Sequence, residues 1–164
     1  MAHFLHNNWQ EENIELSILA TGQELGTYHQ ELGNAGFHVN HIPFSKSIRF
    51  VLETFQLLRN SHFDVVHIHA ERAFFLYAIL AWLNHTAGII WNIHNNFRFS
   101  GFTKYYRGQF RKLINFLNVQ QVSIGQSVYF NELERFDNKT TIINNWCDLE
   151  KLHPPTKIEK EEAQ

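Results

Sequence analysis

The chain has 164 residues, a mass of 19.4 kDa and a net charge of −2, with 44% hydrophobic and 18% charged residues. This length predicts one domain, and the composition excludes a mainly disordered protein. The near balance of 14 Lys and Arg against 16 Asp and Glu argues against a generic nucleic-acid-binding protein. A single cysteine, Cys147, excludes an intramolecular disulfide framework and indicates a reducing compartment.

Apolar segments of strand length alternate along the chain with segments of helical periodicity. Strands are expected at 14–20, 37–44, 64–70, 89–94, 119–124 and 140–144. Helices are expected at 23–34, 47–60, 71–84, 101–118 and 127–136. This alternation predicts βαβ units, and therefore an α/β fold with a Rossmann-like, doubly wound, mostly parallel sheet of about six strands.

The longest apolar run, Ala73–Leu83, contains eleven residues. A membrane-spanning helix needs about 20 apolar residues, so this run is predicted to be a core helix. The N-terminus lacks the basic segment and apolar stretch of a signal peptide. The expected location is therefore the cytoplasm, with peripheral contact to the inner face of the membrane as a further expectation.

Three histidines fall near the carboxyl ends of predicted strands, where ligands bind in open α/β sheets. His67 and His69 share one face of a strand, and His94 ends the neighbouring predicted strand. One interpretation is a metal site, although no third ligand has suitable spacing. A second is that His94 acts as a general base, because a neutral imidazole can accept a proton from a hydroxyl. In a third, all three are hydrogen-bonded histidines without a catalytic role.

The positive charges are concentrated in one part of the chain. No acidic residue occurs between Glu71 and Glu132, and this stretch contains six Lys and Arg residues. Either an anionic partner or a solvated face balanced by acids elsewhere explains this asymmetry. In the helix predicted at 101–118, Lys104, Arg107 and Arg111 lie on one face, with Lys112 beside them. An aromatic and apolar stripe lies on another face: Phe102, Tyr105, Tyr106, Phe110, Leu113, Ile114 and Leu117.

A basic amphipathic helix of this kind can lie on an anionic membrane surface, although an apolar stripe also serves core packing. Other candidates for chemistry are weak. Ser123 and Ser127 flank a glycine without the nucleophile-elbow pattern, and Cys147 has no base beside it in the sequence. The absence of a Gly-rich, Lys-Ser/Thr phosphate loop disfavours a nucleoside triphosphatase.

Four motifs follow one another in a characteristic order. They are Asp64-Val-Val-His-Ile-His69, Asn92-Ile-His94-Asn95, Val122-Ser-Ile-Gly-Gln-Ser127 and the segment Ile142–Pro154. Together they resemble the N-terminal, acceptor-side domain of a family 4 glycosyltransferase of the two-Rossmann GT-B type, over about residues 14–154. The resemblance implies a domain at 1–153 and a linker at 154–164 towards an absent C-terminal donor domain. It also implies that the family's first strand and Gly-rich turn are missing from the start of this domain.

The resemblance makes His94 the active-site histidine and aligns Asn145 and Asp148 with the family's last signature. Departures from the pattern include Asn92, Asn95 and Trp146, and the bulky Trp146 stands where the family has glycine. Predicted site residues, by role, are His94 as catalytic; Asn95, Glu71, Arg72, Ser127 and Asn145 as substrate-binding; and Lys104, Arg107, Arg111 and Lys112 as basic residues facing the membrane or acceptor.

The implied reaction transfers a sugar from a nucleotide-diphosphate sugar, the donor substrate, to a glycan or lipid-linked acceptor. The resemblance implies no metal and no covalently bound cofactor. A donor domain, in cis or in trans, is the implied partner, and the isolated chain is expected to be inactive because an interdomain site needs both walls. The alternative is a stand-alone Rossmann-like binding module or one subunit of a split glycosyltransferase.

Overall fold

The computed structural model describes residues 14–145. The predicted domain start, Trp146, Cys147, Asp148 and the linker at 154–164 lie outside the described residues. The elements in chain order are β1 (Ser17–Ala20), α2 (His29–Asn34), β2 (His38–His41), α3 (Ile48–Ser61), β3 (Val65–Ile68), α4 (Phe74–Leu83), β4 (Gly88–Ile93), α5 (Gly101–Phe116), β5 (Gln120–Ser123), α6 (Gln126–Phe136) and β6 (Thr141–Ile142). All paired strands are parallel, so the predicted α/β alternation is confirmed.

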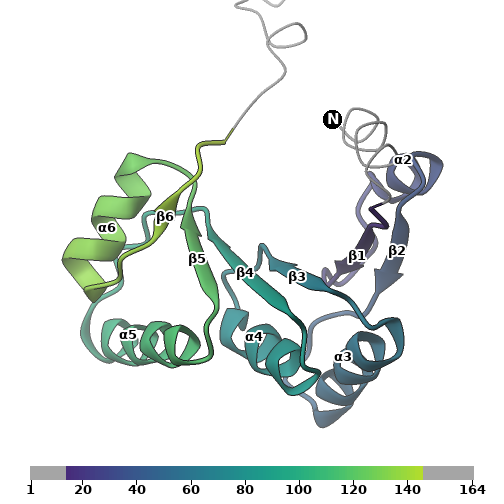
Figure 1. The fold of residues 1–164 in the computed structure, drawn as a ribbon, viewed down its shortest axis with the longest axis horizontal. Coiled ribbons are helices and arrows are strands. Elements are labelled where there is room, and N and C mark those ends of the chain that lie inside the picture. Colours follow the sequence, from purple (N-terminus) through teal and green to yellow (C-terminus); the bar gives the residue numbers. More distant parts are fainter. Residues whose placement is uncertain (1–13, 146–164) are drawn as a thin grey trace, which may run out of the picture.

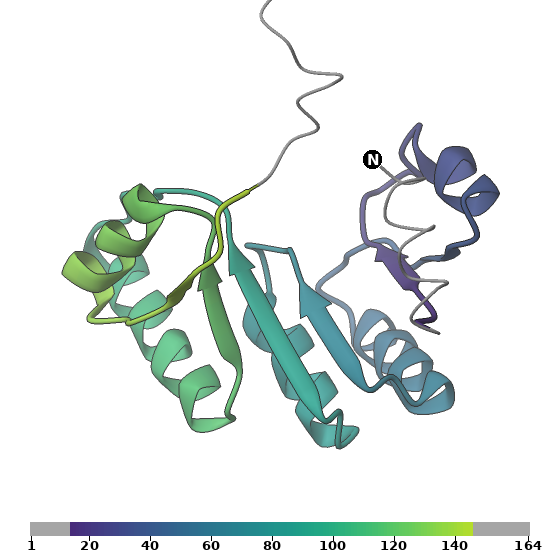
Figure 2. The same ribbon diagram turned by 45° about the horizontal axis from the view of Figure 1, so that its top comes forward.

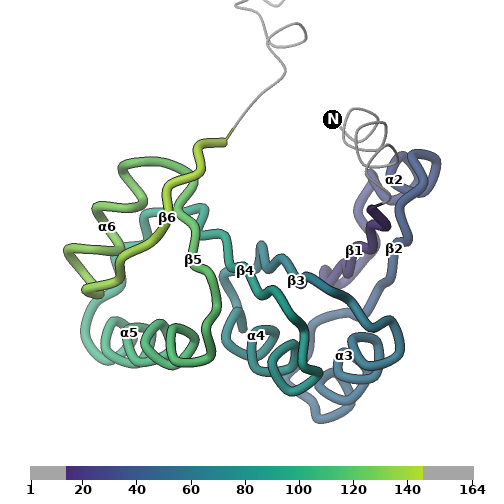
Figure 3. Tube along the Cα trace, viewed as in Figure 1, coloured from purple at the N-terminus to yellow at the C-terminus, as the bar shows by residue number. Residues whose placement is uncertain are grey.

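Within residues 14–145 the strands form two sheets, β1–β2 and β3–β4–β5–β6. Figures 1 and 2 show the two-stranded sheet standing apart from the four-stranded one, and the trace in Figure 3 runs from β2 through α3 to β3 between them. Gly88 N–H donates to Asp64 O at 2.9 Å, which ties β3 to β4. Because parallel strands alternate their hydrogen-bonding directions, Val65 and His67 turn their backbone groups towards the opposite edge, which no other strand of residues 14–145 pairs with.

The core lies between the four-stranded sheet and the helices beside it. Figure 1 shows α5, α4 and α3 in a row beneath the strands, and α6 contacts β5 and β6. Trp91 of β4 is fully buried and stacks on Phe74 of α4, with ring centroids 3.9 Å apart. Burial alternates along β4: Ile89, Trp91 and Ile93 are buried, while their neighbours on the other face are only half-buried. The helical side of the sheet is therefore the better packed side.

Local sequence explains where α3 begins and ends. Ser47 caps it by accepting a hydrogen bond from Phe50 N at 3.3 Å. Phe50, Thr54 and Leu58 recur every four residues and form its buried face. The helix ends at His62, whose φ of 48° is left-handed and breaks the helical pattern. This capping and spacing hold α3 against α4, beside the cleft described below.

The orientation of α5 differs from the prediction. Its core-facing side includes Arg111, which is 2% exposed, and Ile114, which is fully buried. Arg111 is placed inside by Glu132 of α6, whose carboxylate accepts hydrogen bonds from Nε at 2.5 Å and from a terminal guanidinium nitrogen at 2.8 Å. The predicted outward-facing role of Arg111 is therefore wrong, because a buried counter-ion on the following helix neutralises it.

The stripe predicted to be one apolar face of α5 is divided in the structure. Tyr106, Phe110 and Leu117 are half-buried beside Ile114. Phe102, Tyr105 and Leu113 instead face outward, at exposures of 39% to 79%, and Phe116, outside the predicted stripe, is 85% exposed. The outward face of this helix is thus aromatic as well as polar.

Candidate functional site

The candidate site lies where β3 and β4 end. The two strands pair in parallel with Ile68 opposite Trp91, so their carboxyl ends meet at the same edge of the sheet. His69 follows β3 directly, and His94 follows β4. Nδ1 of His69 lies 3.0 Å from Nε2 of His94, within hydrogen-bond distance. The strand register therefore brings together two histidines that are 25 residues apart in the sequence.

His67 extends this pair along β3. The ring centroids of His67 and His69 are 4.2 Å apart, and those of His69 and His94 are 5.2 Å apart. Part of the His69 side chain is open to solvent. The protein nevertheless desolvates the ring, and this burial lowers the pKa of His69 from 6.5 to about 4, with a further contribution from repulsion by His67 and His94. His69 is therefore neutral at physiological pH.

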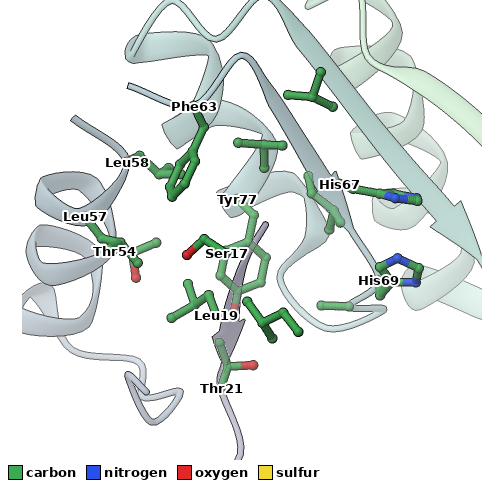
Figure 4. A pocket seen from close by; sticks show the side chains of 15 residues that line it. Ser17, Leu19, Thr21, Thr54, Leu57, Leu58, Phe63, His67, His69 and Tyr77 are labelled. Atoms are coloured by element: carbon green, nitrogen blue, oxygen red, sulfur yellow. The ribbon is translucent and has the colours of Figure 1, made fainter. Parts of the chain in front are cut away.

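A cleft of about 510 Å³ opens beside these histidines, between β1, α3 and β3. Figure 4 shows Ser17, Leu19 and Thr21 of the β1 segment in front of Tyr77, with His67 and His69 at one side of the cleft. Burial raises the pKa of the Tyr77 hydroxyl above its ordinary value, partly offset by a hydrogen bond with Thr21. The cleft thus offers a protonated phenol, two imidazoles and the hydroxyls of Ser17, Thr21 and Thr54 on a wall that is otherwise apolar.

A second cleft, of about 720 Å³, is lined by residues of the loops after β2 and β3 and of α3, α4 and α5. Glu71 and Arg72 reach it from the loop after β3, and Lys46 reaches it from the loop after β2. Arg107 of α5 donates a 2.5 Å hydrogen bond to Glu71, and both side chains are mostly buried. Burial raises the pKa of Glu71, while Arg111 and Arg107 oppose this effect.

Of the cations around the second cleft, Arg72 and Lys46 are exposed, whereas Arg107 is engaged by Glu71. Tyr106, Phe75 and Phe110 add an aromatic wall, in which Phe75 and Phe110 are stacked at 4.0 Å. The cleft therefore combines two available positive charges with an apolar lining. Such a lining is suited to a ligand with an anionic and an apolar part.

The remaining predicted substrate-binding residues are Asn95, Ser127 and Asn145, which follow β4, begin α6 and follow β6. Asn95 is exposed directly after His94, and Ser127 is exposed in the first turn of α6. Asn145 is exposed after β6, and its backbone N–H donates to Ile124 O at 3.2 Å. Their assigned roles stay predictions.

Of the four predicted basic residues, Lys104 and Lys112 are exposed on α5. Arg111 is buried against Glu132, which corrects its prediction as an acceptor-facing or membrane-facing residue. Arg107 is turned inward to Glu71, so its charge is already paired. Of the positive charges predicted to face outward on this helix, only those of Lys104 and Lys112 do so.

Sequence reasoning noted the three histidines but missed the His69–His94 hydrogen bond and the role of Tyr77 in the cleft. An HxH pattern on one strand, followed by a histidine at the end of the next strand, was the available signal for the first. Tyr77 gave no signal, because it lies inside a continuous apolar run. Within residues 14–145, no group of three or more His, Cys, Asp and Glu side chains is arranged to hold a metal ion.

The helices between residues 14 and 145 are all too short or too polar to cross a bilayer. Residues 1–151 match the family model of Glycosyltransferase Family 4, which confirms the resemblance inferred from the four motifs. Among solved structures, a glycosyltransferase from Rickettsia africae ESF-5 is similar, with a TM-score of 0.68 and 16% sequence identity. The match covers 99% of this chain and 44% of that chain, so this chain spans less than half the length of its structural relative. At this identity the likeness shows the fold alone. No curated protein sequence matches the chain.

Proposed function

Because the chain belongs to Glycosyltransferase Family 4, we propose that it forms the acceptor-side half of a GT-B-type enzyme. This enzyme transfers a sugar from a nucleotide-diphosphate sugar to a glycan or lipid-linked acceptor. The single observation that carries the proposal is the His69–His94 pair at the carboxyl edge of the sheet, 3.0 Å apart. An imidazole at this edge can supply the base that an acceptor hydroxyl needs.

In this proposal His94 accepts or orients the proton of the acceptor hydroxyl. His94 is half-buried, so its ring orientation is limited while it stays accessible to a ligand. The nucleotide sugar binds mainly to a donor domain, which faces this edge from the other side of the site. The 164-residue chain alone is then inactive in transfer, because one wall of the site cannot position both reactants.

The second cleft supports an acceptor with an anionic group. Arg72 and Lys46 are exposed at its rim, and the aromatic side chains behind them fit the apolar part of an amphiphile. This combination favours a lipid-linked acceptor carrying a phosphate or carboxylate over a neutral glycan. Anion recognition by Arg and Lys is charge-assisted and therefore depends on salt concentration.

The outward face of α5 supports peripheral contact with an anionic membrane. Phe102, Tyr105 and Phe116 expose aromatic rings, and Lys104 and Lys112 are exposed on the same helix. Interfacial helices use this combination, in which rings enter the headgroup region and lysines contact anionic lipids. A membrane-bound position would deliver a lipid-linked acceptor to the clefts without requiring a spanning helix.

The proposal is tested by ¹H–¹⁵N NMR titration of the 164-residue chain with three probes: dodecyl phosphate, dodecanol in mixed micelles and UDP-glucose. We expect dodecyl phosphate to shift resonances around Arg72 and His94 more strongly than dodecanol, and UDP-glucose to leave them unchanged. The variant Arg72→Glu should weaken the effect of dodecyl phosphate, whereas the control Lys139→Glu, at an exposed position away from both clefts, should not. Saturable binding of UDP-glucose without binding of dodecyl phosphate would overturn the assignment of this chain to the acceptor side.

A further inference from the structure

The cleft of about 510 Å³ is bounded on one side by an edge of β3 that has no strand partner within residues 14–145. Asp64 O accepts the N–H of Gly88 in β4, so the alternation along β3 turns the backbone groups of Val65 and His67 away from β4. Both residues line the cleft, and both are exposed. This edge therefore presents unused backbone donors and acceptors to the cleft.

The opposite side of the cleft is an edge of β1 in the same condition. Leu16 O accepts the N–H of His38 at 3.0 Å, so Ser17 and Leu19 turn their backbone groups away from β2. Ser17 and Leu19 also line the cleft, and no other strand of residues 14–145 pairs with this edge. Two rows of backbone donors and acceptors therefore border one cleft.

The two edges run in the same direction. In Figure 4 the chain runs down the view from Ser17 to Thr21 on β1, and in the same sense from His67 to His69 on β3. All strand pairs within the two sheets are parallel as well. One extended segment parallel to both edges can therefore pair with β1 on one side and with β3 on the other, which would join the two sheets into one.

The helices beside the cleft specify the side chains of such a segment. Leu57 and Leu58 of α3 and Tyr77 of α4 line it, so apolar residues are favoured at the alternate positions that face these helices. Thr54 of α3 lines the same cleft and is 1% exposed, and its hydroxyl has no hydrogen-bond partner within residues 14–145. Buried hydroxyls normally have a partner, so the cleft also lacks one polar contact that an occupant can supply.

An occupant that pairs with both edges must have both of its own edges free. Each strand described in this chain is already paired on one side, so a strand of a second folded copy can satisfy only one edge of the cleft. Residues 1–13 contain no Val, Ile or Thr, whereas buried parallel strands are rich in Val, Ile and Leu. An extended segment of another polypeptide meets both requirements.

We propose that this cleft is a docking groove for one extended, Val- and Ile-rich segment of a partner polypeptide, which inserts parallel to β1 and β3 and pairs with both. The backbone N–H groups of the four edge residues donate to this segment, and their carbonyl oxygens accept from it: Ser17, Leu19, Val65 and His67. The proposal is independent of the role of His94, because backbone groups of β1 and β3 make the contact.

Amide hydrogen exchange of the ¹⁵N-labelled 164-residue chain tests this proposal. The probe is a peptide with the sequence of β4, residues 88–93, flanked by two lysines at each end for solubility. We expect saturable binding and at least fivefold slower exchange at the four edge amides, equivalent to about 1 kcal/mol for each hydrogen bond gained. Val39 of β2 is the matched control, because its N–H points to the outer edge of that sheet and should exchange at an unchanged rate.

Two N-methylated forms of the peptide test whether both of its edges are used. Methyl groups on the amides of residues 89 and 91 block one edge, and methyl groups on 90 and 92 block the other. Each form should bind about 25-fold more weakly, because two hydrogen bonds are lost. In the protein, Val65→Pro removes one donor at the cleft and should weaken the unmodified peptide about fivefold, whereas Val39→Pro should not. The amide spectrum of each variant reports whether it is folded.

Each other occupant of the cleft gives a different result, and each would overturn the proposal. Addition to a single edge would protect Val65 and His67 alone, and one methylated form would still bind. Protection of all four amides in the dilute free chain would assign the cleft to residues of this chain. Protection that increases with protein concentration in the absence of peptide would assign it to a second copy. Absence of saturable binding by the unmodified peptide would also reject the docking groove.

Discussion

Removing the positive charge of Arg111 leaves a buried carboxylate without its partner. The side chains of Arg111 and Glu132 are 2% and 1% exposed, and two hydrogen bonds of 2.5 and 2.8 Å join them. The Arg111 guanidinium also lies 4.0 Å from the Phe136 ring centroid, and Asn138 donates to Glu132 at 2.9 Å. Arg111→Met keeps most of the side-chain volume, so its main effect is electrostatic.

The expected loss is large for a domain of this size. Breaking a buried pair by removing one partner costs about 3–5 kcal/mol, because the remaining charge is desolvated and uncompensated. Domains are typically stable by only about 5–15 kcal/mol, so Arg111→Met should lose about a fifth or more of the total. Adding Glu132→Gln removes the stranded charge and leaves an amide oxygen for Asn138. The double variant should therefore recover about 2 kcal/mol relative to Arg111→Met.

Urea unfolding followed by far-UV circular dichroism measures these differences. Arg49→Met is the control, because Arg49 pairs with Glu53 on the surface and its side chain is 85% exposed. It should unfold at the same urea concentration as the parent chain within error. The reasoning would be refuted if Arg111→Met unfolded with the control, or if Glu132→Gln made Arg111→Met less stable instead of rescuing it.

Three further predictions concern His69, His62 and the outward face of α5. Unfolded His69 takes up a proton below pH 6.5 that the folded ring excludes down to about 4. The contribution of His69 to the free energy of unfolding is therefore complete above pH 6.5 and lost as the pH falls towards 4. The pKa shift would correspond to about 3.4 kcal/mol in a fully buried site, and solvent exposure reduces this to about 1 kcal/mol. Urea titrations at several pH values should show this slope, and a His69→Asn variant with an equal slope would contradict it. His62 has a left-handed φ of 48°, so His62→Gly should raise the free energy of unfolding by about 1 kcal/mol, and a decrease in thermal melts would argue against strain there. Phe102→Asp combined with Phe116→Asp should reduce co-sedimentation with phosphatidylglycerol vesicles, whereas equal binding by both forms would exclude a role for this face.

Much of the fold was predictable because its strongest signals are local. The apolar run around Tyr77 and the stretch containing Trp91 predicted α4 and β4, and both elements lie in the core. The helix that starts after Ser47 was likewise predicted from its amphipathic pattern, which the structure confirms. Strand ends were predicted too long, because apolar residues continue past the last backbone pair; β6 keeps two paired residues of the five expected.

Contacts between residues far apart in the chain could not be predicted from the sequence. Nothing local to Arg111 indicates that Glu132, 21 residues later, neutralises it, so a basic residue in a helix was assigned to the surface. The burial of that pair also decides which face of α5 is turned outward, and it exposes Phe102. For the site, alternation along β3 placed His67 and His69 on one face, but only the strand register fixes the distance from His69 to His94.

The separation of the two sheets also affects how the domain behaves in concentrated solution. Val65, 55% exposed, and His67 present backbone donors and acceptors at an edge that has no strand partner within residues 14–145. An edge of this kind is a template on which another extended chain can add, including a second molecule. We therefore expect self-association by strand addition at this edge, which increases with protein concentration. It should begin before any loss of helical content.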